Sequence, residues 1–116
     1  MTYNQNLDEP IFSIQTRVAG AYYYFFNKIG YEAVEEWTFV RLEREPTNPY
    51  DDYAVKVLLD GELMGYVPRG LSSIISNIIK NNEFQLKSFI KLENSENNSH
   101  KRSDWDFVLI IHAYKD

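Results

Sequence analysis

Hydrophobic and polar residues alternate along several short stretches of this chain, which is the pattern of half-buried β-strands. The first stretch begins at Ile11 and places Phe12, Ile14, Thr16 and Val18 on one face. The same reasoning predicts five further strands, over Trp37–Glu43, Tyr53–Leu59, Glu62–Val67, Phe84–Leu92 and Trp105–Tyr114. Asp60-Gly61, between two of these stretches, is a strong signal for a hairpin turn.

One segment has the spacing of a helix instead. After Pro68, apolar residues recur at intervals of three and four positions: Leu71, Ile74, Ile75, Ile78 and Ile79. This predicts an amphipathic helix that ends at Lys80-Asn81-Asn82 and buries the whole apolar stripe in the core. About six short strands with one or two helices predict a mainly β domain, an OB-like small β-barrel.

Five aromatic residues follow Gly20 without interruption: Tyr22, Tyr23, Tyr24, Phe25 and Phe26. In a strand, neighbouring side chains point to opposite faces, so we expect some of these rings to be exposed or to cover a sheet edge. Gly20 itself suggests a bulge or a close backbone contact.

Length and composition indicate one domain. The chain has 116 residues, of which 44% are hydrophobic and none is cysteine. We expect a flexible N-terminus over residues 1–10 and a folded domain over residues 11–116. The absence of cysteine excludes disulfides and Cys-type zinc sites, and neither histidine has a partner at metal-ligand spacing. The sequence therefore predicts no metal and no cofactor.

Charge and hydropathy bear on the partner and the compartment. No apolar run is long enough to span a membrane and the first residues lack the features of a signal peptide, so we expect a cytoplasmic protein that binds no membrane. The net charge of −5 argues against a generally basic surface for nucleic acid. DNA binding then requires a local basic groove, with strongly salt-dependent affinity.

The segment from Arg44 to Asp51 is the most informative part of the chain. Pro46 and Pro49 each fix φ and remove a backbone donor, which predicts a stiff loop between two strands. The loop carries Tyr50 next to Asp51, a ring that can stack on a base beside a carboxylate that can accept a hydrogen bond from a hydroxyl group.

Each candidate residue also has a structural interpretation. The Tyr50 ring can pack over its own loop, and Asp51 can cap a turn by accepting a backbone N–H, with one oxygen free for each role. Arg69, at the start of the helix, either binds a phosphate or forms a salt bridge. Arg44 is a candidate phosphate contact that can instead pair with a neighbouring strand, and Asn48 is expected to be mainly structural.

The order of these motifs resembles the HIRAN domain. The family pattern V-x-G-x-x-Y-Y is present from Val18 to Tyr24, and REPxNPYDxxAxxV is present from Arg44 to Val57. A glycine-led turn into a helix follows at Gly65-Tyr66-Val67. The resemblance runs from about Phe12 to Ile79.

The resemblance implies an OB-like barrel that captures the 3′ end of single-stranded DNA in DNA repair and replication-fork processing. It assigns base stacking to Tyr23 and Tyr50, contact with the 3′-hydroxyl to Asp51, and a basic contact to Arg69. Tyr66 stands where some members have His, and Tyr22 stands where DNA-binding members place Arg. We expect Tyr24 to join the aromatic cluster, and a separate ATPase or nuclease to act as protein partner.

Catalysis and protein binding are the two other functions that the sequence must be compared with. No phosphate loop, nucleophile motif or suitably spaced pair of carboxylates is present, so we do not expect an enzyme. A protein or peptide interaction module is the alternative, in which the aromatic groove or a barrel edge strand holds a partner. The acidic net charge favours this alternative, whereas the Tyr50–Asp51 pair and Arg69 favour DNA.

Overall fold

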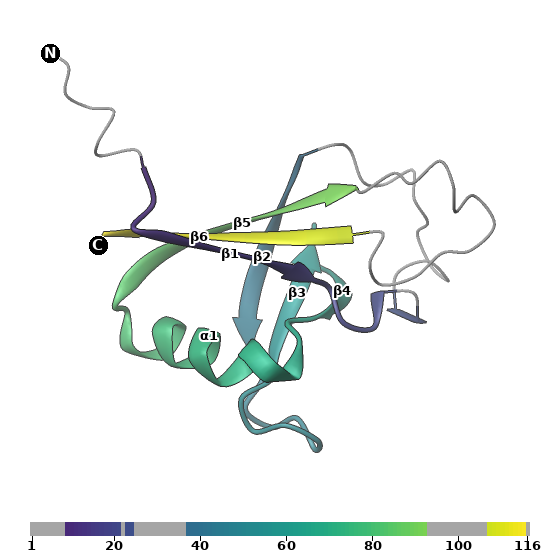
Figure 1. Cartoon of the computed structure of the whole chain (residues 1–116). Coiled ribbons are helices and arrows are strands. Elements are labelled where there is room, and N and C mark those ends of the chain that lie inside the picture. Colours follow the sequence, from purple (N-terminus) through teal and green to yellow (C-terminus); the bar gives the residue numbers. More distant parts are fainter. Residues whose placement is uncertain (1–8, 22, 25–36, 93–106, 116) are drawn as a thin grey trace, which may run out of the picture.

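A computed structural model describes residues 9–21, 23–24, 37–92 and 107–115. This part of the chain contains six strands and one helix, in the order that the sequence pattern predicts, with the helix between the fourth and fifth strands (Figure 1). The elements are β1 (Phe12–Arg17), β2 (Thr38–Arg44), β3 (Val55–Leu59), β4 (Glu62–Tyr66), α1 (Arg69–Asn81), β5 (Phe84–Leu92) and β6 (Phe107–Lys115). Most of the expected N-terminal segment, the loop over residues 93–104 and Trp105 lie outside the described residues.

The strands form one antiparallel sheet in the order β1-β6-β5-β2-β3-β4. The sheet curls until its two edge strands meet beyond the end of β1 (Figure 1). There Ala19 and Tyr66 form an isolated antiparallel bridge with N–H···O distances of 2.7 and 2.9 Å. The expected mainly β, barrel-like fold is confirmed, as a curled half-barrel closed at this single seam.

The seam depends on a close backbone approach at Gly65. A Cβ atom on this residue would lie 2.5 Å from the carbonyl oxygen of Ala19 and 2.6 Å from Cγ1 of Val18. Such distances are shorter than any van der Waals contact, so only glycine lets β4 meet the chain that leaves β1.

The third strand is shorter than the sequence predicted. It begins at Val55 rather than Tyr53, because the two preceding residues belong to a turn. The Tyr53 N–H donates to Oδ1 of Asp51 and the Ala54 N–H donates to its carbonyl oxygen. Side-chain capping by an Asp therefore takes the place of strand pairing.

The core is the inward face of the sheet, with α1 packed against it. Fully buried side chains include Val55, Val57, Met64, Ile75, Ile90, Phe107, Leu109 and Ile111. The alternation of buried and exposed positions in β3 and β5 is as predicted. It follows from the two-residue period of a strand.

The helix is rotated relative to the predicted stripe. Ile75 and Ile78 are buried as expected, but the prediction was wrong for Ile74, which is 52% exposed. Ser72 and Ser76 are buried instead, because their hydroxyl groups bond to Asp51 and Arg44, respectively. These two polar contacts turn the serine side of α1 toward the loop.

The aromatic run starts in a helical turn rather than in a strand. The carbonyl oxygen of Gly20 accepts hydrogen bonds from the N–H groups of Tyr23 and Tyr24. Gly20 has φ of 80°, and a Cβ atom there would lie 2.9 Å from the Tyr24 ring, so the close approach at this glycine is to a side chain and not to the backbone as expected. Tyr23 is 70% exposed, in agreement with the expectation that some of these rings face solvent. Tyr22, Phe25 and Phe26 lie outside the described residues.

Candidate nucleic-acid interface

A pocket of about 210 Å³ lies beside the seam where β1 and β4 meet. One wall is the loop between β2 and β3, and the other is the start of α1. The pocket brings together six of the residues predicted from sequence: Tyr24, Asn48, Tyr50, Asp51, Tyr66 and Arg69. Ala19 and Arg69, which are 50 positions apart in the chain, both line this pocket because the sheet curls back on itself. The seam thus places the predicted loop and the helix start in one site.

Asn48 holds the loop in shape. Its Oδ1 accepts hydrogen bonds from the N–H groups of Tyr50 at 2.8 Å and Asp51 at 3.1 Å. Its Nδ2 donates to Oε1 of Glu45 at 2.8 Å. The amide group is therefore engaged by the loop itself, which agrees with the structural role expected for Asn48 and explains how the loop stays rigid.

The Tyr50 ring does not pack over its own loop. It is 80% exposed, the highest value among the exposed large hydrophobic residues of the described chain. Its backbone is nevertheless fixed, because its carbonyl oxygen accepts a hydrogen bond of 2.7 Å from Nη2 of Arg69. An exposed ring on a fixed backbone is a suitable stacking platform.

Both carboxylate oxygens of Asp51 already have a partner. Oδ1 accepts the Tyr53 N–H at 2.9 Å, which confirms the turn-capping role. Oδ2 accepts the hydroxyl of Ser72 on α1 at 2.8 Å. Each oxygen has two acceptor sites, so the carboxylate retains capacity for a further donor from the pocket. Ser72 was missed from sequence because it resembles any small residue of a helix.

Arg69 is exposed at the first position of α1. Among the described residues, the ion pairs involve Arg41, Glu43, Glu45 and Lys56, and none includes Arg69. One guanidinium nitrogen donates to Tyr50, which leaves other N–H groups facing the pocket. No salt bridge of the kind weighed for Arg69 is present in this part of the chain.

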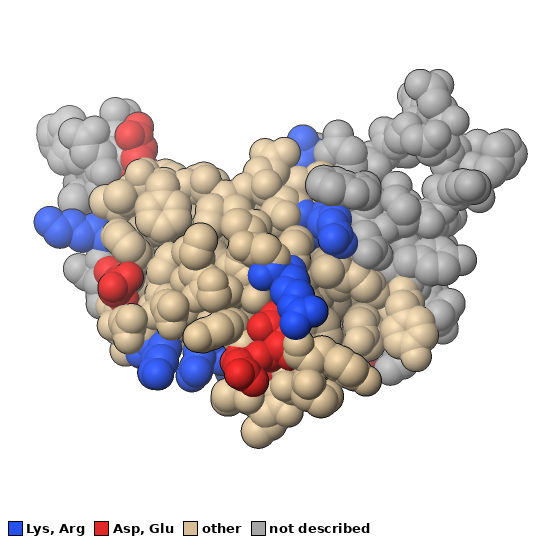
Figure 2. Space-filling view, turned by 60° about the horizontal axis from the view of Figure 1, so that its bottom comes forward, with Lys and Arg blue, Asp and Glu red and all other residues tan. Residues whose placement is uncertain are grey.

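Figure 2 views the molecule from the side that carries α1 and the loop between β2 and β3. Charged side chains are scattered over a mostly uncharged surface and do not gather into one basic patch. A ligand at this face would therefore be held by a few directed contacts, in keeping with the net charge of −5.

The Tyr66 hydroxyl points to the base of the loop. It donates to Oε1 of Glu45 at 2.8 Å. Burial and the neighbouring Glu45 carboxylate together raise the pKa of Tyr66 to about 12. The hydrogen bond from the Asn48 amide is the main reason that the pKa of Glu45 lies below its usual value. Burial raises this pKa, whereas the hydrogen bond from Tyr66 and the charge of Lys56 lower it further. Glu45 was missed as a site residue, although it belongs to the Arg-Glu-Pro motif.

The aromatic residues after Gly20 divide between the pocket and its rim. Tyr24 lines the pocket and packs edge-on against Tyr66, with ring centroids 5.7 Å apart. Tyr23 packs edge-on against Tyr24 at 5.0 Å and does not line the pocket. Tyr23, one of the two residues that the resemblance assigned to stacking, thus lies beside the pocket, whereas Tyr50 lines it. Tyr22 lies outside the described residues.

Arg44 is a second predicted residue that does not line the pocket. Its Nε donates to Oγ of Ser76 at 3.1 Å, under the middle of α1. This contact is the pairing with a neighbouring element that was weighed against phosphate binding. The side chain ties β2 to the helix.

Neither a metal site nor a membrane span is found in the described part of the chain. No group of three or more His, Cys, Asp or Glu residues there could hold a metal ion. The described residues also contain no helix long and apolar enough to cross a membrane.

Comparison with known families identifies the chain. The family model of the HIRAN domain matches residues 11–109. This chain belongs to the HIRAN domain family. The resemblance that the Arg-Glu-Pro and Gly-Tyr-Val motifs suggested is therefore confirmed, and the matched range contains every predicted site residue.

One curated relative is the helicase-like transcription factor of Oryctolagus cuniculus, which is 30% identical over 92 residues. The aligned region covers 78% of this HIRAN chain and only 9% of that protein. The chain therefore corresponds to a small part of a much longer relative.

Solved HIRAN structures share the fold. The crystal structure of the HIRAN domain of human HLTF has a TM-score of 0.68 at 24% identity, over 97% of this chain and 84% of that one. An NMR structure of the HLTF HIRAN domain in its DNA-bound conformation has a TM-score of 0.55 at 23% identity, over 95% and 80% of the two chains. At these identities the likeness establishes the curled half-barrel fold.

Proposed function

We propose that this HIRAN domain binds the 3′ end of single-stranded DNA in the pocket beside the seam. The observation that carries the proposal is the Tyr50 ring, 80% exposed on a fixed backbone and adjacent to Asp51 and Arg69. A DNA-bound conformation of the related HLTF domain supports DNA as the ligand class.

Each pocket residue has a distinct part in this proposal. The terminal base stacks on Tyr50, with Tyr24 and the rim residue Tyr23 as further aromatic contacts; such stacking contributes about 1–3 kcal/mol per base. The guanidinium of Arg69 and the first N–H groups of α1 receive a backbone phosphate. The 3′-hydroxyl donates to Asp51, whose carboxylate already accepts from Ser72 and Tyr53.

The carboxylate accounts for the preference for a hydroxyl end. A terminal phosphate next to Asp51 would bring two anions together in a pocket of about 210 Å³. A hydroxyl group instead supplies the donor that a carboxylate accepts, and a hydrogen bond to a charged group contributes about 1.5–3 kcal/mol. The pocket should therefore distinguish the two ends of the same strand.

The wider role is proposed from the resemblance to the family. We propose that end capture serves DNA repair or replication-fork processing beside a separate ATPase or nuclease. We assign no catalysis to the domain, since the described pocket offers a stacking ring, one carboxylate and one guanidinium without a nucleophile–base pair.

Fluorescence anisotropy with single-stranded oligonucleotides tests the proposal directly. Wild-type protein should bind a strand with a free 3′-hydroxyl more tightly than the same strand with a 3′-phosphate, and Asp51→Asn should reduce that difference more than it reduces affinity. Asp52→Asn is the matched control, because Asp52 is exposed and does not line the pocket. Equal binding of the two strand ends by the wild type would contradict end recognition. Binding that does not respond to salt would favour the peptide alternative.

A further inference from the structure

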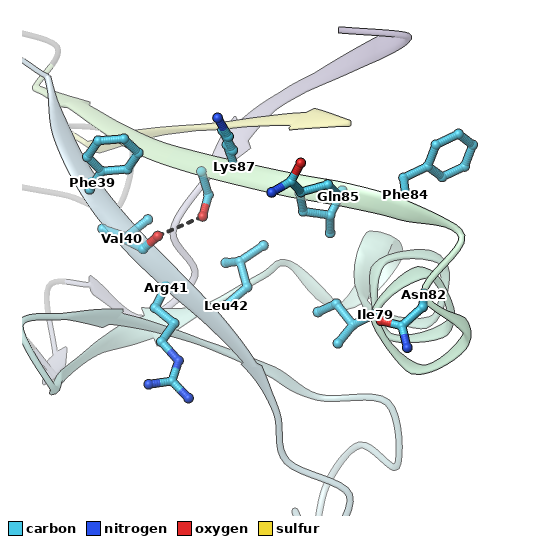
Figure 3. Close-up of a pocket in the computed structure, with 11 residues that line it drawn as sticks. Phe39, Val40, Arg41, Leu42, Ile79, Asn82, Phe84, Gln85 and Lys87 are labelled. Atoms are coloured by element: carbon cyan, nitrogen blue, oxygen red, sulfur yellow. Dashed lines mark hydrogen bonds between the residues drawn. The ribbon is translucent and has the colours of Figure 1, made fainter. Parts of the chain in front are cut away.

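The barrel has a second opening on the side away from the seam. Strands β2 and β5 pair only between Thr38–Val40 and Ser88–Ile90, where the Ser88 hydroxyl donates to the Val40 carbonyl at 2.8 Å. Beyond this point β2 leaves β5, because Arg41–Arg44 pair with β3 while β5 stays paired with β6 along its whole length. The end of α1 approaches the gap (Figure 3). A groove of about 480 Å³ results, larger than the pocket at the seam.

The groove has an apolar floor and a polar, cationic rim. Leu42 and Ile79 supply apolar surface between the strands and the helix end (Figure 3). Leu86 adds to the apolar lining. Arg41 and Lys87 are exposed, and Gln85 and Asn82 add amide groups. None of the described residues that line the groove is acidic, although the whole chain carries a net charge of −5. Glu43 lies 4.0 Å from Arg41 farther along β2, outside the lining.

Phe39 stands at the rim of the groove with most of its surface in solvent. It is 67% exposed, and its ring contacts that of Phe89 in the described part of the chain, with centroids 4.7 Å apart and planes inclined by 34°. Alternation along β2 puts Phe39 and Arg41 on the same outward face. An exposed ring next to a cation is the pairing that a base and its phosphate require.

The aromatic surface continues outward over the neighbouring strands. Trp37 is 54% exposed and packs edge-on against Phe89, which in turn contacts His112 on β6. Two lysines of β5 lie over rings of this surface, Lys87 over Tyr114 at 5.3 Å and Lys91 over Trp37 at 5.7 Å. Aromatic rings and the two lysines of β5 therefore share one surface beside the groove.

We propose that the groove between β2 and β5, with Phe39 at its rim, is a second binding surface for single-stranded DNA that takes an internal segment of the strand. A base stacks on Phe39, neighbouring apolar surface of the groove receives the next base, and Arg41 and Lys87 contact the phosphates. The groove shares no residue with the pocket at the seam, so it requires no strand end.

The charge of the lining favours DNA over a peptide. A peptide that adds to a strand edge is held by backbone hydrogen bonds and side-chain pockets, and needs no cationic rim. A polyanion is attracted by two exposed cations without a competing carboxylate in the lining, even in an acidic protein. The exposed rings supply the sequence-tolerant part of the affinity.

A closed circle of single-stranded DNA isolates this surface, because it has no end for the seam pocket. The circle should contain about 30 nucleotides, longer than the roughly 4–16 nucleotides that one OB fold covers. Wild-type protein is expected to bind it in anisotropy measurements, and Phe39→Ala should weaken this binding about 5- to 100-fold. Ile74→Ala is the matched control, an exposed apolar side chain on α1 whose loss should leave binding unchanged.

Two further comparisons of variants distinguish binding in the groove from binding in the pocket at the seam. Tyr50→Ala should leave binding of the circle intact while it weakens binding of a short strand with a 3′-hydroxyl, and Phe39→Ala should do the reverse. Lys87→Ala should flatten the salt dependence for the circle, whereas Arg69→Ala, in the pocket at the seam and outside the groove lining, should not. Failure of the wild type to bind the circle, or equal effects of Phe39→Ala and Ile74→Ala, would overturn the proposal and leave the groove to a peptide partner. Neither outcome affects the test of end capture.

Discussion

The hydroxyl of Ser72 donates a 2.8 Å hydrogen bond to Oδ2 of Asp51, across 21 positions of the chain. Three residues earlier in α1, Arg69 donates to the carbonyl oxygen of Tyr50 at 2.7 Å. The first turn of the helix thus fixes both the ring-bearing residue and the carboxylate of the loop. The stacking and end recognition that we propose for this site therefore depend on the position of α1.

Removal of the helix contact should affect recognition of the strand end. Ser72→Ala deletes the donor to a partly buried carboxylate, so we expect the free energy of unfolding to fall by about 1–3 kcal/mol. The preference for a 3′-hydroxyl over a 3′-phosphate should shrink as well, because Asp51 is then held only by the Tyr53 N–H. Urea unfolding and anisotropy measure the two effects. Ser73→Ala, on the adjacent position, should change neither.

The Tyr50 ring should matter for binding and not for stability. Because the side chain is 80% exposed, Tyr50→Ala should leave the melting temperature unchanged and weaken binding of a short single strand by about 1–3 kcal/mol. Tyr53→Ala, a 49% exposed ring three residues on and outside the pocket lining, is the control. A lower melting temperature with normal binding would show that the ring serves the fold.

The contribution of Arg69 can be read from salt dependence. Loss of one phosphate contact should reduce the slope of log affinity against log salt by about 0.7 for a single strand. Arg69→Ala should also release the Tyr50 carbonyl, so affinity should fall by more than the charge alone explains. Lys80→Ala removes one exposed cation at the far end of the same helix and should leave the slope unchanged. An unaltered slope in Arg69→Ala would rule out a phosphate contact at this residue.

The raised pKa of Tyr66 predicts a loss of stability at high pH. Its folded-state pKa is about 12 against an ordinary value of 10.0, so the unfolded chain loses this proton first as pH rises between these values. The stabilising hydrogen bond to Glu45 is fully present below pH 10, and its contribution of about 1–2 kcal/mol, reduced for partial solvent exposure, is lost toward pH 12. Chemical unfolding of the wild type and Tyr66→Phe at pH 8 to 12 tests this. The advantage of the wild type should disappear over that interval, and a constant difference would contradict the assignment.

The seam should not tolerate a side chain at Gly65. Gly65→Ala places Cβ 2.5 Å from the Ala19 carbonyl, between two backbone segments that cannot both move away without breaking the bridge. We expect destabilisation of about 1–3 kcal/mol, measured by thermal unfolding. Gly70→Ala is the control, since a Cβ atom there meets nothing within 4 Å and alanine favours the helix. Equal stability of the two variants would mean that the edges are not held at this point.

The sequence by itself determined the order and kind of the elements. Alternation from Phe12 to Val18, the hairpin signal at Asp60-Gly61 and the helical spacing after Pro68 are local properties, set by the geometry of the backbone over a few residues. The stiff loop could be predicted for the same reason, because proline restricts its own φ wherever it occurs. The family motifs then located Tyr50, Asp51 and Arg69 in one site.

Tertiary structure alone decided which side chains share a surface. The curl of the sheet brings Ala19 to Tyr66, which puts Tyr24 rather than Tyr23 in the pocket lining. The hydrogen bonds of Ser72 and Ser76 rotate α1 and expose Ile74, contrary to its apolar spacing. The groove beside Phe39 exists because β2 leaves β5 after three paired positions and pairs with β3 instead. These features depend on contacts between residues far apart in the chain, which no local periodicity encodes.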